Sequence, residues 1–200
     1  MTLVVSKVYF DTCCFVDVVQ QQLGFKPDAQ PDHVECCRTF LSAAAAGDVI
    51  IYTSLATLSE FIYSKSDELD SNGKRVKVLN DVVKENIRRL LLSGRPVVPV
   101  QATPKIVSLT RDMCWEGNLP LNMTPIDRIH LASASVMSCS HFVTTDRKLS
   151  NRASEILKAL HVRLVTCDQV KDLLPHTYFP PQLNLPHVET KQPQKKVKRK

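Results

Sequence analysis

The sequence has no long hydrophobic segment. None of its apolar runs approaches the roughly 20 residues that a membrane-spanning helix needs, so we expect no membrane association. The first residues, Met-Thr-Leu-Val-Val-Ser-Lys, carry no positive charge before their apolar residues and contain no recognisable cleavage site. A secretory signal peptide is therefore not expected, and the predicted compartment is the cytoplasm.

Cys-x-x-Cys pairs are also absent, although the chain contains seven cysteines, an odd number. The six histidines likewise form no ligand pair. A zinc site usually draws on closely spaced ligand pairs, so the sequence does not predict one. We interpret the cysteines as reduced thiols that serve as small buried hydrophobic residues, with a redox or metal role as the alternative. They are Cys13, Cys14, Cys36, Cys37, Cys114, Cys139 and Cys167.

Acidic residues are absent from the last ten positions. Residues 191–200 hold six of the 26 lysines and arginines and none of the 20 acids, so the rest of the chain is formally neutral and this segment carries the net charge of +6. A basic segment without regular patterning predicts contact with a polyanion, with an affinity that falls as salt rises. A solubilising end or a localisation signal is the alternative interpretation.

What the sequence does have is the composition of a folded domain. Of its 200 residues, 44% are hydrophobic and 23% are charged, as in ordinary globular proteins. This length suits one domain with a sizeable core. From residue 175 onward prolines recur and the hydrophobic patterning stops. We therefore predict a domain over residues 1–174 and a basic, proline-containing, disordered tail over 175–200.

Segments with strand and helix patterns alternate along the domain, without internal repeats. This order predicts a three-layer α/β/α fold with a central, mostly parallel sheet of about five strands. The predicted strands are 8–11, 48–53, 96–100, 141–145 and 162–165. The segment 12–22 is predicted to be a loop that leads into a short helix. The other predicted helices are 33–46, 54–65, 76–92, 104–114, 126–137, 151–160 and 168–174.

Four acids occupy comparable places in this pattern. Asp11 and Asp146 end predicted strands, while Glu60 and Asp127 lie early in predicted helices. Strand ends and the starts of the following helices share one edge of a parallel sheet. Carboxylates gathered there repel one another and require a counter-charge, for which Mg²⁺ or Mn²⁺ is suited. Taken singly, each acid could instead be a turn former or helix cap, and Asp127 could simply favour its helix dipole.

The motifs around these acids resemble the PIN-domain family, and within it the VapC-type toxin ribonucleases. The resemblance covers roughly residues 5 to 172 and rests on four motifs in order. These are Val8-Tyr9-Phe10-Asp11-Thr12, Leu58-Ser59-Glu60-Phe61, the segment from Asp127-Arg128-Ile129-His130 through Leu131-Ala132-Ser133-Ala134, and Phe142-Val143-Thr144-Thr145-Asp146.

The resemblance implies catalytic, metal-binding roles for Asp11, Glu60, Asp127 and Asp146, which would hold Mg²⁺ or Mn²⁺. It implies that Thr144, with Thr12, helps to arrange the site. For His130, one turn beyond Asp127, a packing or supporting role is favoured over metal ligation. The chain is longer than the small toxins, around residues 66–95 and in the tail, which leaves substrate and partner open.

The activity implied is metal-dependent endoribonuclease hydrolysis of RNA phosphodiester bonds, with an antitoxin protein and a homodimer as implied partners. Arg128, Arg147 and Lys148 adjoin the acids and are candidate contacts for substrate phosphate. The alternative is a non-catalytic PIN fold used as an RNA-binding or assembly module. A phosphatase with a strand-end aspartate nucleophile is disfavoured, because such enzymes carry a second acid two residues later, where this chain has Cys13.

Overall fold

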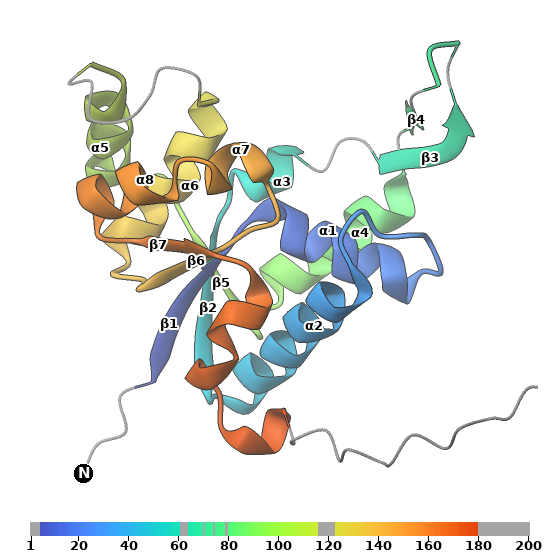
Figure 1. The fold of residues 1–200 in the computed structure, drawn as a ribbon, viewed down its shortest axis with the longest axis horizontal. Helices are drawn as coiled ribbons and strands as arrows, with labels where there is room; N and C mark the ends of the chain where they lie inside the picture. Colours follow the sequence, from blue (N-terminus) through green and yellow to red (C-terminus); the bar gives the residue numbers. More distant parts are fainter. Residues whose placement is uncertain are drawn as a thin grey trace, which may run out of the picture.

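The computed structural model describes residues 5–60, 64–69, 71–73, 75–78, 80–115 and 123–179. At its centre is a five-stranded sheet in the order β5-β2-β1-β6-β7, in which every pair of neighbours is parallel. This confirms the predicted α/β architecture and the five strands (Figure 1). The strands are β1 (Ser6–Phe10), β2 (Val49–Ser54), β5 (Val97–Val100), β6 (His141–Val143) and β7 (Arg163–Val165).

Helices cover both faces of this sheet (Figure 1). Alternate residues of β1 point to opposite faces, so Val8 and Phe10 join one hydrophobic core while Tyr9 joins the other. The first core includes residues of α1 (Thr12–Gln22), α2 (Pro31–Ala46), α4 (Asp81–Leu92) and the 3₁₀ helix η1 (Cys167–Leu173). The second includes residues of α5 (Pro104–Trp115), α6 (Pro125–Val136) and α8 (Ala153–Leu160).

Several helix boundaries differ from the prediction. The helix predicted over 76–92 begins only at Asp81, because residues Arg75–Val78 form strand β4 and the Asn80 side chain caps the helix by accepting from the amide of Val83 at 3.0 Å. The predicted helix 54–65 was also too long. Within the described residues it is α3 (Thr57–Glu60), and residues Ser64–Leu69 form strand β3.

Strands β3 and β4 pair in an antiparallel hairpin that projects from the body (Figure 1). The hairpin occupies part of the extra length noted around residues 66–95. Its turn contains the predicted Asn72-Gly73 signal, and Gly73 adopts φ +70°, a conformation that glycine enters without steric cost.

The start of the predicted tail packs on the body. Residues His176–Tyr178 form the 3₁₀ helix η2, the Tyr178 hydroxyl donates to Asp48 Oδ2 at 2.6 Å, and the Phe179 ring lies 6.4 Å from that of Phe40. The rest of the predicted tail, including the basic segment 191–200, lies outside the described residues.

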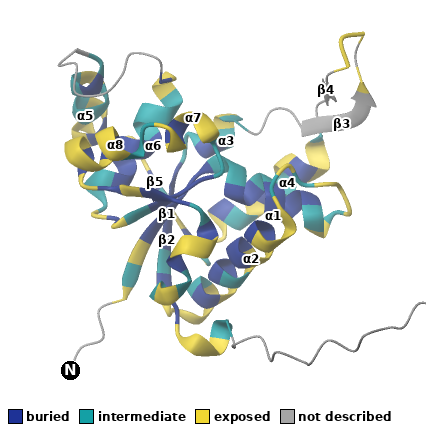
Figure 2. Cartoon of the chain, in the orientation of Figure 1, coloured by how far each residue is buried: buried dark blue, intermediate teal, exposed yellow. Residues whose placement is uncertain are grey.

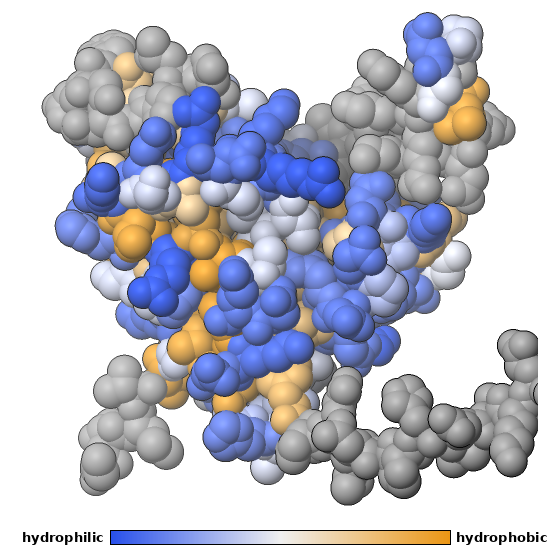
Figure 3. All heavy atoms as spheres, in the orientation of Figure 1, coloured by the Kyte–Doolittle hydropathy of each residue, from blue (hydrophilic) through white to orange (hydrophobic). Residues whose placement is uncertain are grey.

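The sheet carries the most deeply buried residues, and exposed residues lie on the outer helix faces (Figure 2). Hydrophilic side chains cover most of the described surface on the face drawn in Figure 3. Among the described helices, none is long and apolar enough to cross a membrane.

Candidate active site

Asp11 follows the last residue of β1 and caps α1. Its Oδ1 accepts a hydrogen bond from the Thr12 amide at 2.8 Å, and its Oδ2 accepts one from the Thr144 hydroxyl at 2.6 Å. The side chain is only 8% exposed. Burial raises the pKa of Asp11 above its ordinary value, and the nearby Glu60 carboxylate adds to this, although His130, Thr144 and Thr12 oppose it. An ionised Asp11 would therefore gain from a cation.

Glu60 lies at the end of α3 and reaches the same place. Its Oε2 accepts hydrogen bonds from the Thr12 hydroxyl and from His130 Nε2, the latter at 3.0 Å. Partial burial raises the pKa of Glu60, but these two bonds outweigh it and hold that pKa below its ordinary value. Thr12 therefore links the two acids, with its amide on Asp11 and its hydroxyl on Glu60.

The His130 ring is oriented by a contact between its Nδ1 atom and a buried tyrosine. The Ser54 amide donates to the Tyr9 oxygen at 2.6 Å, and the Tyr9 oxygen lies 2.7 Å from His130 Nδ1. Burial raises the pKa of Tyr9 well above its ordinary value, so its hydroxyl keeps its proton and donates it to Nδ1. The imidazole then carries its own proton on Nε2, where it faces Glu60. The predicted supporting role for His130 thus has a physical basis.

Asp146 is joined to Asp11 through Thr144. The Asp146 amide donates to Thr144 Oγ1 at 3.0 Å, while the same hydroxyl donates to Asp11. Asp146 also caps the short helix α7 (Arg147–Ser150), which the sequence pattern did not predict, by accepting from the Lys148 amide at 2.6 Å. The residue is half-buried, and its link to Asp11 runs through its backbone amide.

Asp127 is engaged differently. It belongs to a capping box, in which Asp127 Oδ2 accepts from the Thr124 amide at 3.0 Å and Thr124 Oγ1 accepts from the Asp127 amide at 3.1 Å. Asp127 therefore caps its own helix, which is the structural role that the sequence left open for this acid. Within the part of the chain that the structure describes, no three of the four acids place ligand oxygens all within 4.8 Å of one another.

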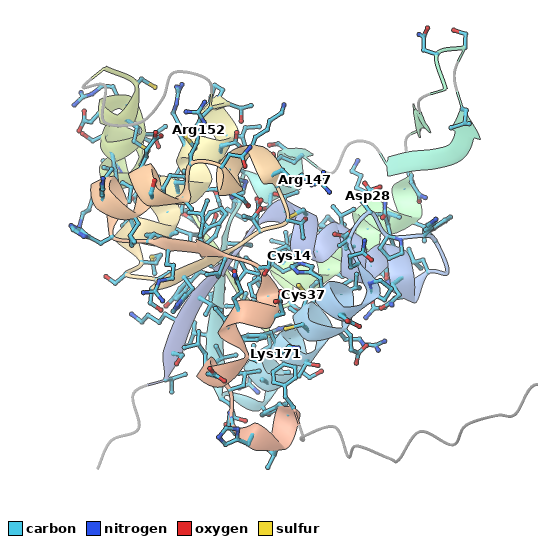
Figure 4. The ribbon with its side chains drawn as sticks, in the orientation of Figure 1. Cys14, Asp28, Cys37, Arg147, Arg152 and Lys171 are labelled. Carbon is cyan, nitrogen blue, oxygen red and sulfur yellow. The ribbon has the colours of Figure 1, made fainter. Side chains whose placement is uncertain are left out.

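The three basic residues lie in different surroundings. Arg147 and Lys148 are exposed on α7, next to Asp146 in sequence. Arg147 and Thr145 line an open cavity of about 680 Å³ (Figure 4). Arg128 is half-buried, and its guanidinium donates to the Cys114 sulfur on α5.

The donor set is suited to a hard divalent cation. Asp11, Glu60 and Asp146 offer carboxylate oxygens, the ligand type that Mg²⁺ and Mn²⁺ prefer. Asp11 Oδ1 accepts a single hydrogen bond, from the Thr12 amide, and keeps a second lone pair for a cation, whereas Oδ2 accepts from both the Thr144 hydroxyl and the Cys13 thiol.

A second group of possible ligands was missed in the sequence. Cys14, His33 and Cys37 are buried and place one ligand atom each within 4.8 Å of the others. The search for Cys-x-x-Cys pairs could not find them, because the spacing in sequence is His33-x₃-Cys37. That spacing puts two side chains on one face of a helix and was the available signal.

Comparisons with known proteins give little more. No protein-family model matches the chain, and no curated protein sequence matches it. Among solved structures, the crystal structure of VapBC2 from Rickettsia felis bound to a DNA fragment from their promoter aligns with a TM-score of 0.47 and 15% identity, over 80% of this chain and 97% of that one. A likeness this weak assigns no activity to the chain.

Proposed function

We propose that the chain is a PIN-type endoribonuclease that hydrolyses RNA phosphodiester bonds with Mg²⁺ or Mn²⁺. The observation that carries the proposal is the network around Asp11. The Thr144 hydroxyl donates to Asp11 and accepts from the backbone amide of Asp146, and Thr12 bonds both Asp11 and Glu60, so residues that follow β1, end α3 and follow β6 are linked at one edge of the sheet. Acids with a purely structural role do not require hydrogen bonds that link them to one another, whereas the ligands of a cation are usually oriented by such bonds.

In this proposal Asp11, Glu60 and Asp146 hold the cation, with Asp127 supplying further negative charge from α6. A bound cation would neutralise phosphate charge and lower the pKa of an attacking water. Thr144 and Thr12 fix the orientation of the carboxylates. His130 directs its Nε2 proton at Glu60 and keeps that acid ionised. The exposed guanidinium of Arg147 and the ammonium of Lys148 bind the substrate phosphates, and Arg128 is the third candidate for such a contact.

The partners follow from the same proposal. The basic segment 191–200 supplies an electrostatic contact to RNA. A protein antitoxin, a homodimer and a cytoplasmic location belong to the toxin form of the proposal, and the chemistry requires no membrane. Because metal-assisted hydrolysis does not use the 2′-hydroxyl, discrimination of RNA from DNA must come from binding.

One observation favours the second candidate, a non-catalytic RNA-binding or assembly module. The Asp127 carboxylate caps its own helix, so its contribution to a cation site requires that capping bond to be shared or broken. A catalytically inactive scaffold would retain the capping role alone.

The test compares purified wild type with Asp11→Asn and with Asp81→Asn, an exposed acid in the first turn of α4. Labelled single-stranded RNA is incubated with each protein and Mn²⁺, Mg²⁺ or chelator. We expect metal-dependent cleavage by wild type and Asp81→Asn, and none by Asp11→Asn, with matching circular dichroism spectra for all three. Equal cleavage by Asp11→Asn would show that the activity does not come from this site.

A further inference from the structure

A buried group of sulfur and nitrogen ligands lies beneath the candidate active site, in the core between α1 and α2. Cys14 comes from α1, while His33 and Cys37 come from the same face of α2; Figure 4 labels Cys14 and Cys37. The Cys167 thiol, at the start of η1, is near enough to Cys37 to affect the pKa of that thiol. Two helices and a 3₁₀ helix thus converge on one point through side chains that are typical ligands of soft cations.

The spacing of these atoms matches a tetrahedral zinc site. Zn–S bonds of about 2.3 Å and Zn–N bonds of about 2.0–2.1 Å place a sulfur and a nitrogen ligand roughly 3.5 Å apart. His33 Nε2 and Cys37 Sγ lie 3.4 Å apart. The Cys14 sulfur stands within 4.8 Å of both ligand atoms, so a small inward rotation of its side chain would complete three ligands.

The group has weak partners without a cation. Cys14 Sγ is 3.4 Å from the Val143 carbonyl, and His33 Nδ1 accepts a long 3.4 Å hydrogen bond from the Cys167 amide. Ligation through His33 Nε2 replaces its hydrogen bond with Cys37 Sγ and moves the imidazole proton to Nδ1, where it faces the Cys167 amide. That buried amide loses its long acceptor, a cost that is smaller than the binding free energy of a structural zinc ion.

An open cavity next to His33 gives an ion a route to this group of ligands. His33 is one of the residues that line the open cavity of about 680 Å³, together with Arg147, Asp168 and Lys171. His33 also contacts Cys37 through Nε2, so this residue belongs both to the lining of the cavity and to the ligand group. Asp28, Arg147 and Lys171 mark this cavity in Figure 4.

We propose that Cys14, His33 and Cys37 form a binding site for a soft or borderline d¹⁰ cation of the Zn²⁺ type, with Cys167 nearest to the fourth position. The two cysteines bind as thiolates, so each ion taken up releases two protons from Cys14 and Cys37 to solvent. The site is separate from the carboxylates, since thiolates select soft cations and carboxylates select hard ones.

The experiment titrates the full chain, reduced and stripped with chelator, with Cd²⁺ in the presence of excess Mg²⁺, which occupies oxygen sites. We expect saturation at one equivalent, with a thiolate-to-cadmium charge-transfer absorption in the ultraviolet and release of about two protons. Cys37→Ser should lower this absorption by about half and weaken Cd²⁺ binding by more than about 100-fold, beyond the loss typical for an outer ligand contact. Cys139→Ser, which replaces a buried thiol outside the group, should change neither.

Two outcomes overturn the proposal. One is a wild-type titration without a charge-transfer band, which needs no variant and stands even if Cys37→Ser fails to fold. The other is an unchanged band in a folded Cys37→Ser protein. Asp11→Asn is expected to keep the band in full, so loss of RNA cleavage and loss of cadmium binding report on different sites.

Discussion

At the scale of single residues, the candidate active site depends on two threonines that each bond two acidic residues. The Thr144 hydroxyl donates to Asp11 and accepts from the Asp146 amide, whereas Thr12 bonds Asp11 through its amide and Glu60 through its hydroxyl. Such groups fix the directions of carboxylates that would otherwise repel one another. The consequence is a set of acids whose individual substitutions have distinct and measurable effects.

Asp11→Asn tests whether this carboxylate binds the cation. Burial disfavours the charged form of Asp11, so its removal should leave the melting temperature in chelator unchanged or raised. Addition of Mn²⁺ should stabilise the wild type and give a much smaller shift in the variant. The measurement is a thermal melt with and without Mn²⁺, and an undiminished shift in Asp11→Asn would exclude Asp11 as a ligand.

Tyr9→Phe tests the support of His130. The change removes the oxygen that accepts from the buried Ser54 amide, so we expect the free energy of unfolding to fall by about 1–3 kcal/mol. It also frees His130 Nδ1, which should raise the Mn²⁺ concentration needed for half-maximal cleavage more than it lowers the maximal rate. Tyr52→Phe, at another buried tyrosine of the same core, is the control.

Cys139 gives a prediction on pH. Burial raises the pKa of this thiol to about 12, whereas in the unfolded chain it is about 8.5. Above the lower value the unfolded state loses this proton first, so the contribution of Cys139 to stability falls with pH, by up to about 1.4 kcal/mol per pH unit. Denaturant titrations between pH 8 and pH 10 should show a shallower decline for Cys139→Ser. Parallel declines would mean that the folded thiol ionises as freely as the unfolded one.

At the scale of secondary-structure elements, helix ends at the functional edge have two uses. Asp11 and Asp146 each accept a hydrogen bond from a backbone amide of the helix that they cap, and Asp127 accepts one from the amide of Thr124, the N-cap residue of α6. Each of the three is also a candidate ligand. Capping satisfies amides that lack a partner in the first turn, and it orients the carboxylate toward the positive end of the helix. Helix capping and cation binding can be tested separately where a second residue also contributes to the cap.

The α6 capping box allows that separation. Thr124→Ala removes the hydroxyl that accepts from the Asp127 amide and should cost about 1 kcal/mol of stability while cleavage stays within about twofold. Asp127→Asn keeps an acceptor at the same place but removes the charge, and should lower cleavage by on the order of 10-fold or more if the charge assists the cation. Equal effects of the two changes on cleavage would reduce Asp127 to a cap.

At the scale of the whole molecule, the excess positive charge and the candidate active site lie in different parts of the sequence. The net charge of +6 arises in residues 191–200, while the candidate active site on the body is acidic and is flanked by Arg147 and Lys148. An acidic site repels a polyanion until a cation neutralises it. The proposed contact with RNA therefore requires positive charge supplied from elsewhere in the chain.

Replacing the six basic residues of 191–200 by glutamine tests this dependence. RNA binding should weaken, and the slope of log K against log salt should fall by up to about 4, the value for six phosphate contacts to a single strand. Filter binding of Asp11→Asn protein over a range of NaCl concentrations measures the slope without cleavage. An unchanged slope would show that the segment does not touch RNA, whatever the body does.

The sequence by itself determined the five strands, their alternation with helices and the placement of Asp11 at a strand end, whereas Asp146 lies beyond β6, which ends at Val143 and not at 145 as predicted. These features are readable because a buried central strand is a continuous apolar run that stops at a polar residue. Each of these features depends on the residues of one short segment, so the sequence of that segment is sufficient to predict it. The early end of α3 and the late start of α4 were missed, since β3 is almost entirely polar and the polar–apolar alternation of β4 covers only Arg75–Val78.

Only the tertiary structure decided which side chains meet. Parallel pairing of β1 with β6 brings Thr144 to Asp11 across 133 positions, and packing of α6 brings His130 to Glu60 across 70. Packing of α1 on α2 likewise places Cys14 beside His33 and Cys37, a group that no spacing rule along the chain contains. Asp127 is the opposite case. The sequence pattern assigned its carboxylate to the shared edge, but in the structure this carboxylate caps its own helix. Distant contacts depend on the register and packing of whole elements, which the residues on either side of a motif do not encode.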